Sequence, residues 1–227
     1  MAVFTIGDTH LSLGSSKPMD IFSGWDNYVC RLEENWRRLI SDEDTVVIAG
    51  DVSWGISLEE AKQDFVFLNS LPGKKILMKG NHDYWWTTVK KMTEFLEANG
   101  LNTLSFLFNN CHVVDGTALC GTRSWLFDVG EPHDEKVMNR EHGRLKMSLD
   151  AAGDLPKIAF LHYPPLCAGA HAEGVLELLH QYGVRRCYYG HLHGAAIRRA
   201  FQGERDGIEF RLVSADSVDF CPVKISI

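Results

Sequence analysis

The chain consists of short apolar segments that alternate with stretches of helical periodicity. Four segments are apolar or β-branched, only four or five residues long, and closely followed by Gly, Asp or His, which is typical of buried strands. These segments are Ala2–Ile6, Thr45–Ala49, Lys75–Met78 and Lys157–Leu161. Buried strands that alternate with helices must be covered on their faces, so this pattern predicts a layered α/β fold.

The intervening segments have helical features. One helix is indicated by apolar residues at helical spacing, namely Tyr28, Leu32, Trp36 and Leu39. Ser57 and Glu60 form a capping box that predicts a helix over Leu58–Leu68. A further helix is expected over Thr87–Asn99, ending at Gly100, because glycine readily adopts the left-handed conformation of a helix end.

The second half of the chain is richer in expected strands. Consecutive strands are predicted at Ser105–Phe108, Cys111–Val114 and Ala118–Gly121, with Asp115-Gly116 as a turn signal. Helices are expected over Glu131–Ala151 and near Gly174–Tyr182. Later strands are expected at Arg186–Tyr189, Ala195–Phe201, Ile208–Val213 and Val223–Ile227. Because we find no linker, repeat or low-complexity tract, we expect one domain over residues 1–227, with two sheets between helices.

Composition limits the partners and the compartment. The formal net charge of −7 disfavours a broad nucleic-acid surface, which depends on clustered Lys and Arg. None of the six cysteines has CxxC spacing, which argues against a zinc ribbon and favours a reducing compartment. The amino terminus lacks the features of a signal peptide, and no apolar run reaches about 18 residues. We therefore expect a cytoplasmic protein with no membrane partner.

Polar clusters follow the ends of five expected strands. They comprise Asp8 with His10, Asp51, Asn81 with His82, His162, and His191 with His193. Ligands of α/β sheets gather beyond the carboxyl ends of strands, so these clusters are expected to meet at one place. A single Asp or His after a strand is often only a turn or cap residue, and the expectation therefore depends on the whole set.

The residue types in these clusters suit divalent metals. Asp, Asn and imidazole without thiolate favour Zn²⁺, Mn²⁺ or Fe. Residues two apart in an extended segment point to the same side, so Asp8 and His10, and likewise His191 and His193, could each chelate an ion. Glycines beside the clusters would allow backbone to approach the site closely, at positions 7, 50, 80 and 190.

The ordered motifs DTH, GD, GNHD, H and GHLH resemble those of the calcineurin-like metallophosphoesterase superfamily over residues 8–193. The resemblance implies a four-layer α/β/β/α sandwich of two mixed sheets flanked by helices, with a centre of two divalent ions (Mn, Fe or Zn). By motif, one ion would be held by Asp8, His10 and His193. The other would be held by Asn81, His162 and His191, and Asp51 would bridge both.

The resemblance also implies a mechanism. A metal-bridging hydroxide would attack phosphorus, and His82 is the candidate general acid for the leaving oxygen. The expected substrate is a phosphorylated small molecule, with a nucleotide-like phosphodiester favoured. A phosphomonoesterase is the alternative, followed by a non-catalytic metal-binding scaffold. A nuclease for polymeric DNA or RNA is disfavoured by the acidic balance. The sequence leaves the oligomeric state open.

One departure concerns the second motif. The protein-phosphatase branch extends it as GDxxDRG, whereas here Trp54 and Gly55 replace the second Asp and the Arg. The partner that orients the catalytic histidine in that branch is therefore missing, and Arg123 is a candidate substitute for the phosphate-binding Arg.

Aromatic residues near the motifs would form either a stacking wall for a planar substrate or ordinary core, namely Trp54, Tyr84, Trp85, Trp86 and Trp125.

Overall fold

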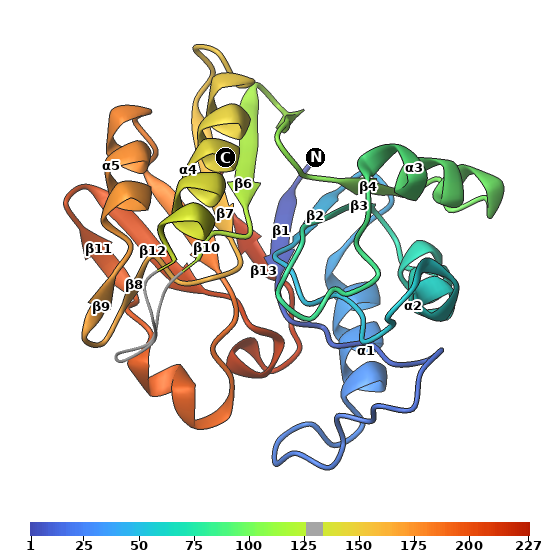
Figure 1. Cartoon of the computed structure of the whole chain (residues 1–227). Helices are drawn as coiled ribbons and strands as arrows, with labels where there is room; N and C mark the ends of the chain where they lie inside the picture. Colours follow the sequence, from blue (N-terminus) through green and yellow to red (C-terminus); the bar gives the residue numbers. More distant parts are fainter. Residues whose placement is uncertain (126–133) are drawn as a thin grey trace.

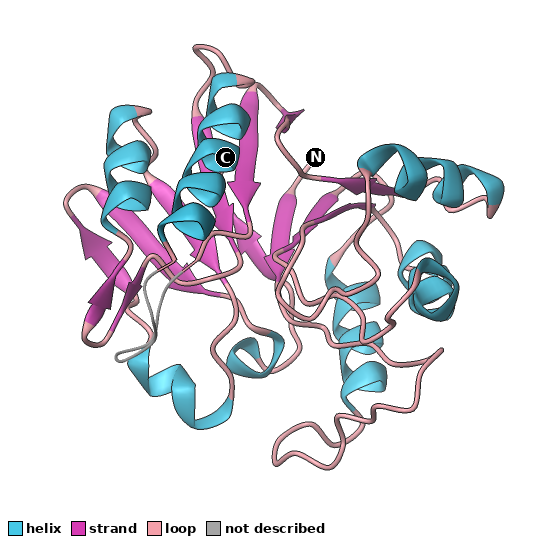
Figure 2. Cartoon of the chain, viewed as in Figure 1, coloured by secondary structure: helices cyan, strands magenta, loops and turns pink. Residues whose placement is uncertain are grey.

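The computed structural model describes residues 1–125 and 134–227. Two sheets lie face to face, and helices cover their outer faces (Figures 1 and 2). The first sheet carries α1 (Tyr28–Leu39), α2 (Leu58–Ser70) and α3 (Val89–Ala98). The second carries α4 (Glu135–Asp150) and α5 (Glu173–Gln181). The four-layer α/β/β/α sandwich expected from the sequence is confirmed.

The first sheet has the strand order β13-β1-β2-β3-β4. Its strands are β1 (Val3–Ile6), β2 (Thr45–Ile48), β3 (Lys74–Leu77), β4 (Leu104–Phe106) and β13 (Val223–Ile225). β1 to β4 are parallel, and β13 is antiparallel to β1. The carboxyl ends of β1, β2 and β3 therefore lie along one edge of the sheet.

The second sheet has the order β11-β12-β10-β7-β6-β5. Its strands are β5 (Cys111–Val114), β6 (Thr117–Thr122), β7 (Lys157–Leu161), β10 (Arg186–Tyr189), β11 (Gly203–Arg205) and β12 (Ile208–Leu212). The four central strands are parallel and the two edge strands antiparallel. The predicted turn between β5 and β6 has positive φ at both Asp115 (45°) and Gly116 (77°), as a tight hairpin requires.

Apolar residues fill the space between the two sheets. Val47 and Ile76 of the first sheet belong to the same buried cluster as Ile158 and Phe160 of the second. Separate buried clusters lie under the helices on each outer face. The central strands are thus covered on both faces, which explains why they were recognisable as continuous apolar runs.

The two sheets are joined where β1 and β12 end. Gly7 and Ser214 form a parallel bridge between the strand ends. The Gly7 N–H donates to the Val213 carbonyl (2.7 Å), and the Gly7 carbonyl accepts from the Ala215 N–H (2.9 Å). A short 3-10 helix, η2 (Ala215–Val218), follows directly. The bridge brings the carboxyl edges of both sheets to one location.

Several elements differ from the sequence predictions, including β11 and η2, which were not expected. The predicted strand Ala195–Phe201 is wrong, because a 3-10 helix, η1 (Gly194–Arg199), occupies this segment. The helical turn lets the Gly194 N–H donate to Asp216 Oδ2 (2.8 Å), a long-range contact that the local sequence does not encode. The hairpin of β8 (Leu166–Cys167) and β9 (Ala170–His171) was not expected.

The predicted helix Glu131–Ala151 begins at Glu135 in α4, and its first residues, 131–133, lie outside the described residues. Ser105–Phe108 was predicted as the first of three consecutive strands. Its strand, β4, belongs to the first sheet, whereas the two strands that follow belong to the second. Among the described residues, no helix is both long and apolar enough to cross a membrane. The expectation of a single domain stays a prediction.

Candidate metal centre

The five polar clusters meet at the joined edge of the sheets. Asp8 and His10 follow β1, Asp51 follows β2, and Asn81 with His82 follows β3. From the second sheet, His162 follows β7, and His191 with His193 follows β10. Contacts link residues up to 183 positions apart in the chain, such as the 3.3 Å between His10 Nε2 and His193 Nε2. The structure thus brings together the eight residues that the sequence predicted.

Four of these residues have left-handed backbone conformations. The φ angles of Asp8, His10, Asp51 and His191 are 57°, 43°, 50° and 74°. This region costs a residue other than glycine about 1–3 kcal/mol, and such strain is concentrated at functional sites. Hydrogen bonds hold the strained loops, including those from the Asp8 N–H to the Gly50 carbonyl (2.8 Å) and from the His10 N–H to the Asp51 carbonyl (3.0 Å).

Two of the predicted glycines allow close approach to carboxylates. A Cβ atom at Gly80 would lie 2.0 Å from Asp51 Oδ1, and one at Gly190 would lie 2.3 Å from Asp8 Oδ2. Both distances are far below van der Waals contact, so a side chain at either position would displace the carboxylate. At Gly7 the same atom would make an ordinary contact of 3.4 Å, so this glycine is not required for space.

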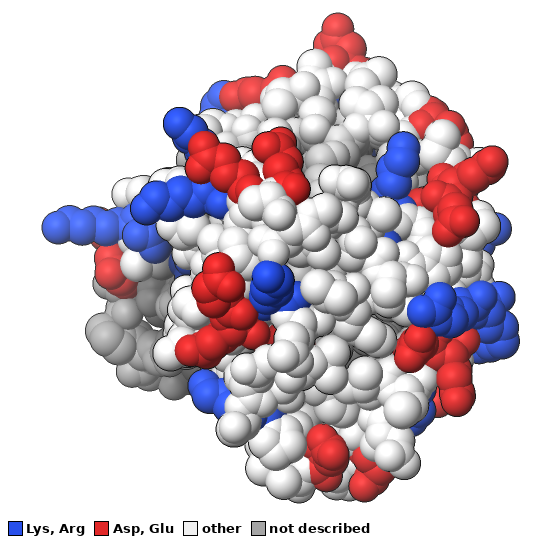
Figure 3. All heavy atoms as spheres, turned by 90° about the vertical axis from the view of Figure 1, so that its right-hand side faces the viewer, with Lys and Arg blue, Asp and Glu red and all other residues white. Residues whose placement is uncertain are grey.

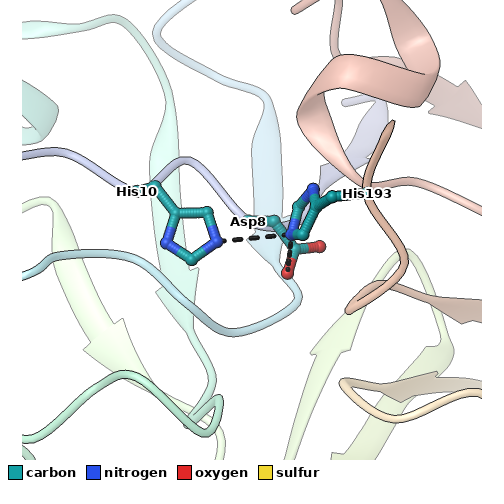
Figure 4. Close-up of side chains that lie close together, drawn as sticks. All are labelled: Asp8, His10 and His193. Atoms are coloured by element: carbon teal, nitrogen blue, oxygen red, sulfur yellow. Dashed lines mark hydrogen bonds and ion pairs between the residues drawn. The ribbon is translucent and has the colours of Figure 1, made fainter. Parts of the chain in front are cut away.

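The first group of converging side chains is Asp8, His10 and His193 (Figure 4). His193 Nε2 lies 3.2 Å from Asp8 Oδ1 and 3.3 Å from His10 Nε2. Atoms that bind one ion at about 2.0–2.2 Å lie about 3.0–3.5 Å from each other. The spacing of this group therefore fits a common divalent ion.

The second group surrounds His162. Its Nδ1 lies 3.1 Å from the Ala49 carbonyl, which can only accept, so Nδ1 carries the proton. A Cβ atom on Gly50 would lie 2.7 Å from this nitrogen, so glycine is also needed there. Nε2 then presents a lone pair to Asn81 Oδ1, 2.6 Å away, and His191 Nδ1 lies 3.0 Å from the same oxygen. A cation bound by all three side chains would bring these atoms this close together, so this group also fits a cation.

Asp51 lies between the two groups. Its Oδ2 is 3.7 Å from His10 Nε2 on one side and 3.6 Å from His162 Nε2 on the other. Its Oδ1 accepts the backbone N–H of His82 (2.8 Å), which fixes the orientation of the carboxylate. This placement is the one that a bridging ligand requires.

Burial and charge set the protonation of the metal-free site. Burial, together with the charge of Asp8, raises the pKa of Asp51 to about 8. Burial would lower the pKa of His193, but the carboxylates of Asp8 and Asp216 raise it to about 10. Burial lowers the pKa of His191 to about 3. Both shifts favour the protonated forms of Asp51 and His193 when no metal is bound, and a metal would have to displace these protons.

Asp216 is a site residue that the sequence reading missed. Its Oδ1 lies 3.0 Å from His193 Nδ1, which leaves Nε2 of the same ring directed at Asp8. A carboxylate on the second nitrogen fixes the ring and the tautomer of a metal-binding histidine. The rule that polar residues follow strand ends would have found it, because Ser214 to Asp216 come directly after the predicted strand Ile208–Val213.

An aromatic residue packs against His82 at the position where the second motif departs from the protein phosphatases. The Trp54 ring lies 4.5 Å from the His82 ring and stacks on His10 at 4.9 Å with an interplanar angle of 22°. His82 Nδ1 is buried without a hydrogen-bond partner among the described residues. Burial lowers the pKa of His82. Packing by Trp54 therefore holds the ring where the phosphatase branch uses a carboxylate.

The remaining aromatic residues divide between core and surface. Trp85 and Trp86 are buried in the core under the helices, as the packing alternative predicted. Tyr84 is exposed and lies edge-on to His82, with 6.1 Å between the rings. Trp125 packs on Tyr163, with 4.8 Å between ring centroids.

Arg123 contacts a buried carboxylate. Its guanidinium lies 3.2 Å from Glu141 Oε1, which also accepts from Arg144 (2.7 Å), and Thr122 bonds the other oxygen of Glu141 (3.1 Å). This contact corresponds to the salt-bridging alternative for Arg123. Its tentative phosphate-binding role stays a prediction.

Comparisons with known proteins bear on the family and the fold of the chain. The family model described as calcineurin-like phosphoesterase matches residues 1–195. A phosphopantetheinyl hydrolase from Mycobacterium tuberculosis is similar in structure, with a TM-score of 0.60, 14% identity, and coverage of 99% of this chain and 95% of that one. A protein of unknown function from Aquifex aeolicus has a TM-score of 0.52 and 16% identity, covering 98% and 95%. A protein from Thermus thermophilus has a TM-score of 0.56 and 11% identity, covering 95% and 89%. No curated protein sequence matches.

Proposed function

Because the chain belongs to the calcineurin-like phosphoesterase family, we propose that it is a hydrolase of phosphoesters that depends on two divalent ions. The observation that carries the proposal is that Asp51 lies between two sets of converging side chains, one made of Asp8, His10 and His193 and the other of Asn81, His162 and His191. Asp8, His10 and His193 would hold one ion. The other would be held by Asn81, His162 and His191, with Asp51 shared.

Each protein group has a defined task in this proposal. When bound, the divalent ions activate water and neutralise charge on the phosphoryl oxygens. Asp51 orients His82 through its backbone N–H, and Trp54 packs on the imidazole ring. His82 is thereby held beside both donor groups, where it would contact the phosphoryl group and donate a proton to the leaving oxygen.

The proposed substrate is a phosphorylated small molecule. Acidic and basic side chains are interspersed among the described residues on the face over α2 and α3, without the continuous basic stripe that polymeric nucleic acid requires (Figure 3). The replacement of the second Asp and the Arg of GDxxDRG favours a diester over a phosphoprotein. A monoester remains the second candidate. The similar phosphopantetheinyl hydrolase suggests adding phosphopantetheinyl compounds to a substrate panel.

Hydrolysis of synthetic esters tests the proposal. We expect the chain, reconstituted with Mn²⁺, to cleave bis(p-nitrophenyl) phosphate or p-nitrophenyl phosphate, and His82→Ala to lose most of this activity. Elemental analysis of the same sample should find about two metals per chain. Inactivity on both esters with Mn²⁺, Fe²⁺ and Zn²⁺ would contradict the proposal. Full biological activity of His82→Ala would instead favour a non-catalytic scaffold.

A further inference from the structure

Lys17 is an exposed cation that lies over aromatic rings beside His82. Its Nζ is 5.0 Å from the centroid of the Trp54 ring and 5.9 Å from that of Tyr84. Both rings also contact His82, at 4.5 Å and 6.1 Å between centroids. Lys17 and His82 therefore share both aromatic neighbours.

The surroundings of Lys17 leave its charge available. None of the ion pairs among the described residues involves it, and its partners are the two ring faces. Cation–π contacts of this kind restrict a flexible lysine without using its hydrogen-bond donors fully. His10 stacks on Trp54 as well. The Trp54 ring is thus already occupied by protein groups, which argues against its use as a platform for a substrate base.

Unpaired polar atoms accompany the ammonium group. Trp54 Nε1 and His82 Nδ1 are both buried without a hydrogen-bond partner among the described residues. The indole N–H can only donate, and buried donors of this kind normally have an acceptor. Trp54 and Lys17, which are in contact, thus each carry donors with no acceptor among the described residues.

We propose that Lys17, held by Trp54 and Tyr84, binds a negatively charged group on the leaving portion of the substrate. This inference rests on the proposed function, in which His82 protonates the leaving oxygen. A group attached to that oxygen would extend past His82 toward Lys17. The preferred substrate class is then a phosphoester whose leaving alcohol carries its own phosphate or carboxylate.

Two substrates that differ only in charge test this inference. They are para-carboxymethylphenyl phosphate and its carboxamide, each prepared as the monoester and as the methyl diester. We expect kcat/KM of the Mn²⁺-loaded protein to be about tenfold higher for the carboxylate, the size expected for a hydrogen bond to a charged group. Lys17→Met should reduce this ratio to about one, and Lys17→Arg should preserve it. Lys74→Met is the matched control, because Lys74 is an exposed lysine at the amino end of β3, opposite the site. It should leave the ratio unchanged.

Binding measurements separate this inference from the proposed function. Calorimetry with the two matching aryl phosphonates, which cannot be hydrolysed, should show the same preference for the carboxylate and the same dependence on Lys17. If the phosphonates bind in a manner that depends on Lys17 but none of the esters is hydrolysed, the proposed function is overturned and the anion subsite is supported. An unchanged ratio in Lys17→Met, in either turnover or binding, would overturn the subsite.

Discussion

Asp216 Oδ1 lies 3.0 Å from Nδ1 of His193, while Nε2 of the same ring lies 3.2 Å from Asp8. We expect Asp216→Asn to weaken metal binding by about 10- to 100-fold, because the carboxylate fixes the ring that faces the ion. Competition with a chelating dye measures this change. Asp219→Asn is the control, because Asp219 is an exposed carboxylate paired with Arg31, and it should bind metal normally. Equal affinities of the two variants would contradict the role of Asp216.

Asp51 and His82 should differ in their effects on metal content. Asp51 Oδ2 lies within 3.7 Å of one imidazole from each donor group, whereas His82 is expected to act on the substrate. We predict that Asp51→Asn loses more metal than His82→Ala, as measured by elemental analysis after identical reconstitution. Equal metal content would undermine the bridging position of Asp51.

Trp54 should control the position of His82. Its ring packs at 4.5 Å from the imidazole, which lacks a carboxylate partner among the described residues. We expect Trp54→Ala to lower kcat by about tenfold or more, because small displacements of a catalytic group are costly. Trp54→Phe should retain most of the activity. Metal content should be measured in both variants, since Trp54 also stacks on His10. A normal kcat in Trp54→Ala would show that packing is not what holds the ring.

Gly80 should tolerate no side chain. A Cβ atom there would lie 2.0 Å from Asp51 Oδ1, so Gly80→Ala should displace the carboxylate, reduce metal content and cost about 1–3 kcal/mol of unfolding free energy. Gly143→Ala is the matched control, because Gly143 lies inside α4 with nothing near the added atom. It should stabilise the protein by about 0.5–1 kcal/mol, since alanine is the better helix former. Thermal unfolding of both variants would reveal whether the signs are opposite.

Metal binding should release protons at neutral pH. The pKa values of Asp51 and His193 are raised to about 8 and about 10, so both groups hold a proton at pH 7 in the apoprotein. Ligands must be deprotonated, so loading should release about two protons and affinity should rise as pH increases from 7 toward 10. Calorimetry in buffers of different ionisation enthalpy measures the release. A binding enthalpy independent of the buffer would rule out this protonation state.

The contribution of His193 to the stability of the apoprotein should decrease as pH rises, whereas metal affinity should increase. Its folded pKa of about 10 lies above the ordinary histidine value of 6.5, because Asp8 and Asp216 favour the charged ring. This contribution to apoprotein stability is therefore complete below about pH 6.5 and is lost as pH rises toward 10. Metal loading removes the same proton, so the loaded protein should lack this dependence.

The metal-type residues were predictable because they follow buried strands, whose apolar runs are visible in the sequence. Parallel strands place their carboxyl ends along one edge, so the meeting of Asp8, Asp51 and His162 follows from topology. Asp216 was predictable by the same rule but lacks a motif. The contact of Trp54 with His82 was not predictable, because it depends on how two loops from different strands pack. The helical turn at Gly194–Arg199 was missed because a tertiary contact with Asp216 favours it over local propensity.

The bridge between Gly7 and Ser214 joins two sheets, and the loops at the ends of both sheets carry the proposed metal donors. Of the seven proposed donors, four lie at or before Asn81 and three at or after His162, so neither fragment of a chain divided between β6 and β7 would contain all of them. Under the proposed function, ion binding would therefore report whether the two halves of the chain have assembled correctly. If a truncated, permuted or redesigned version still binds its ions, its two sheets must pack together as they do in this structure.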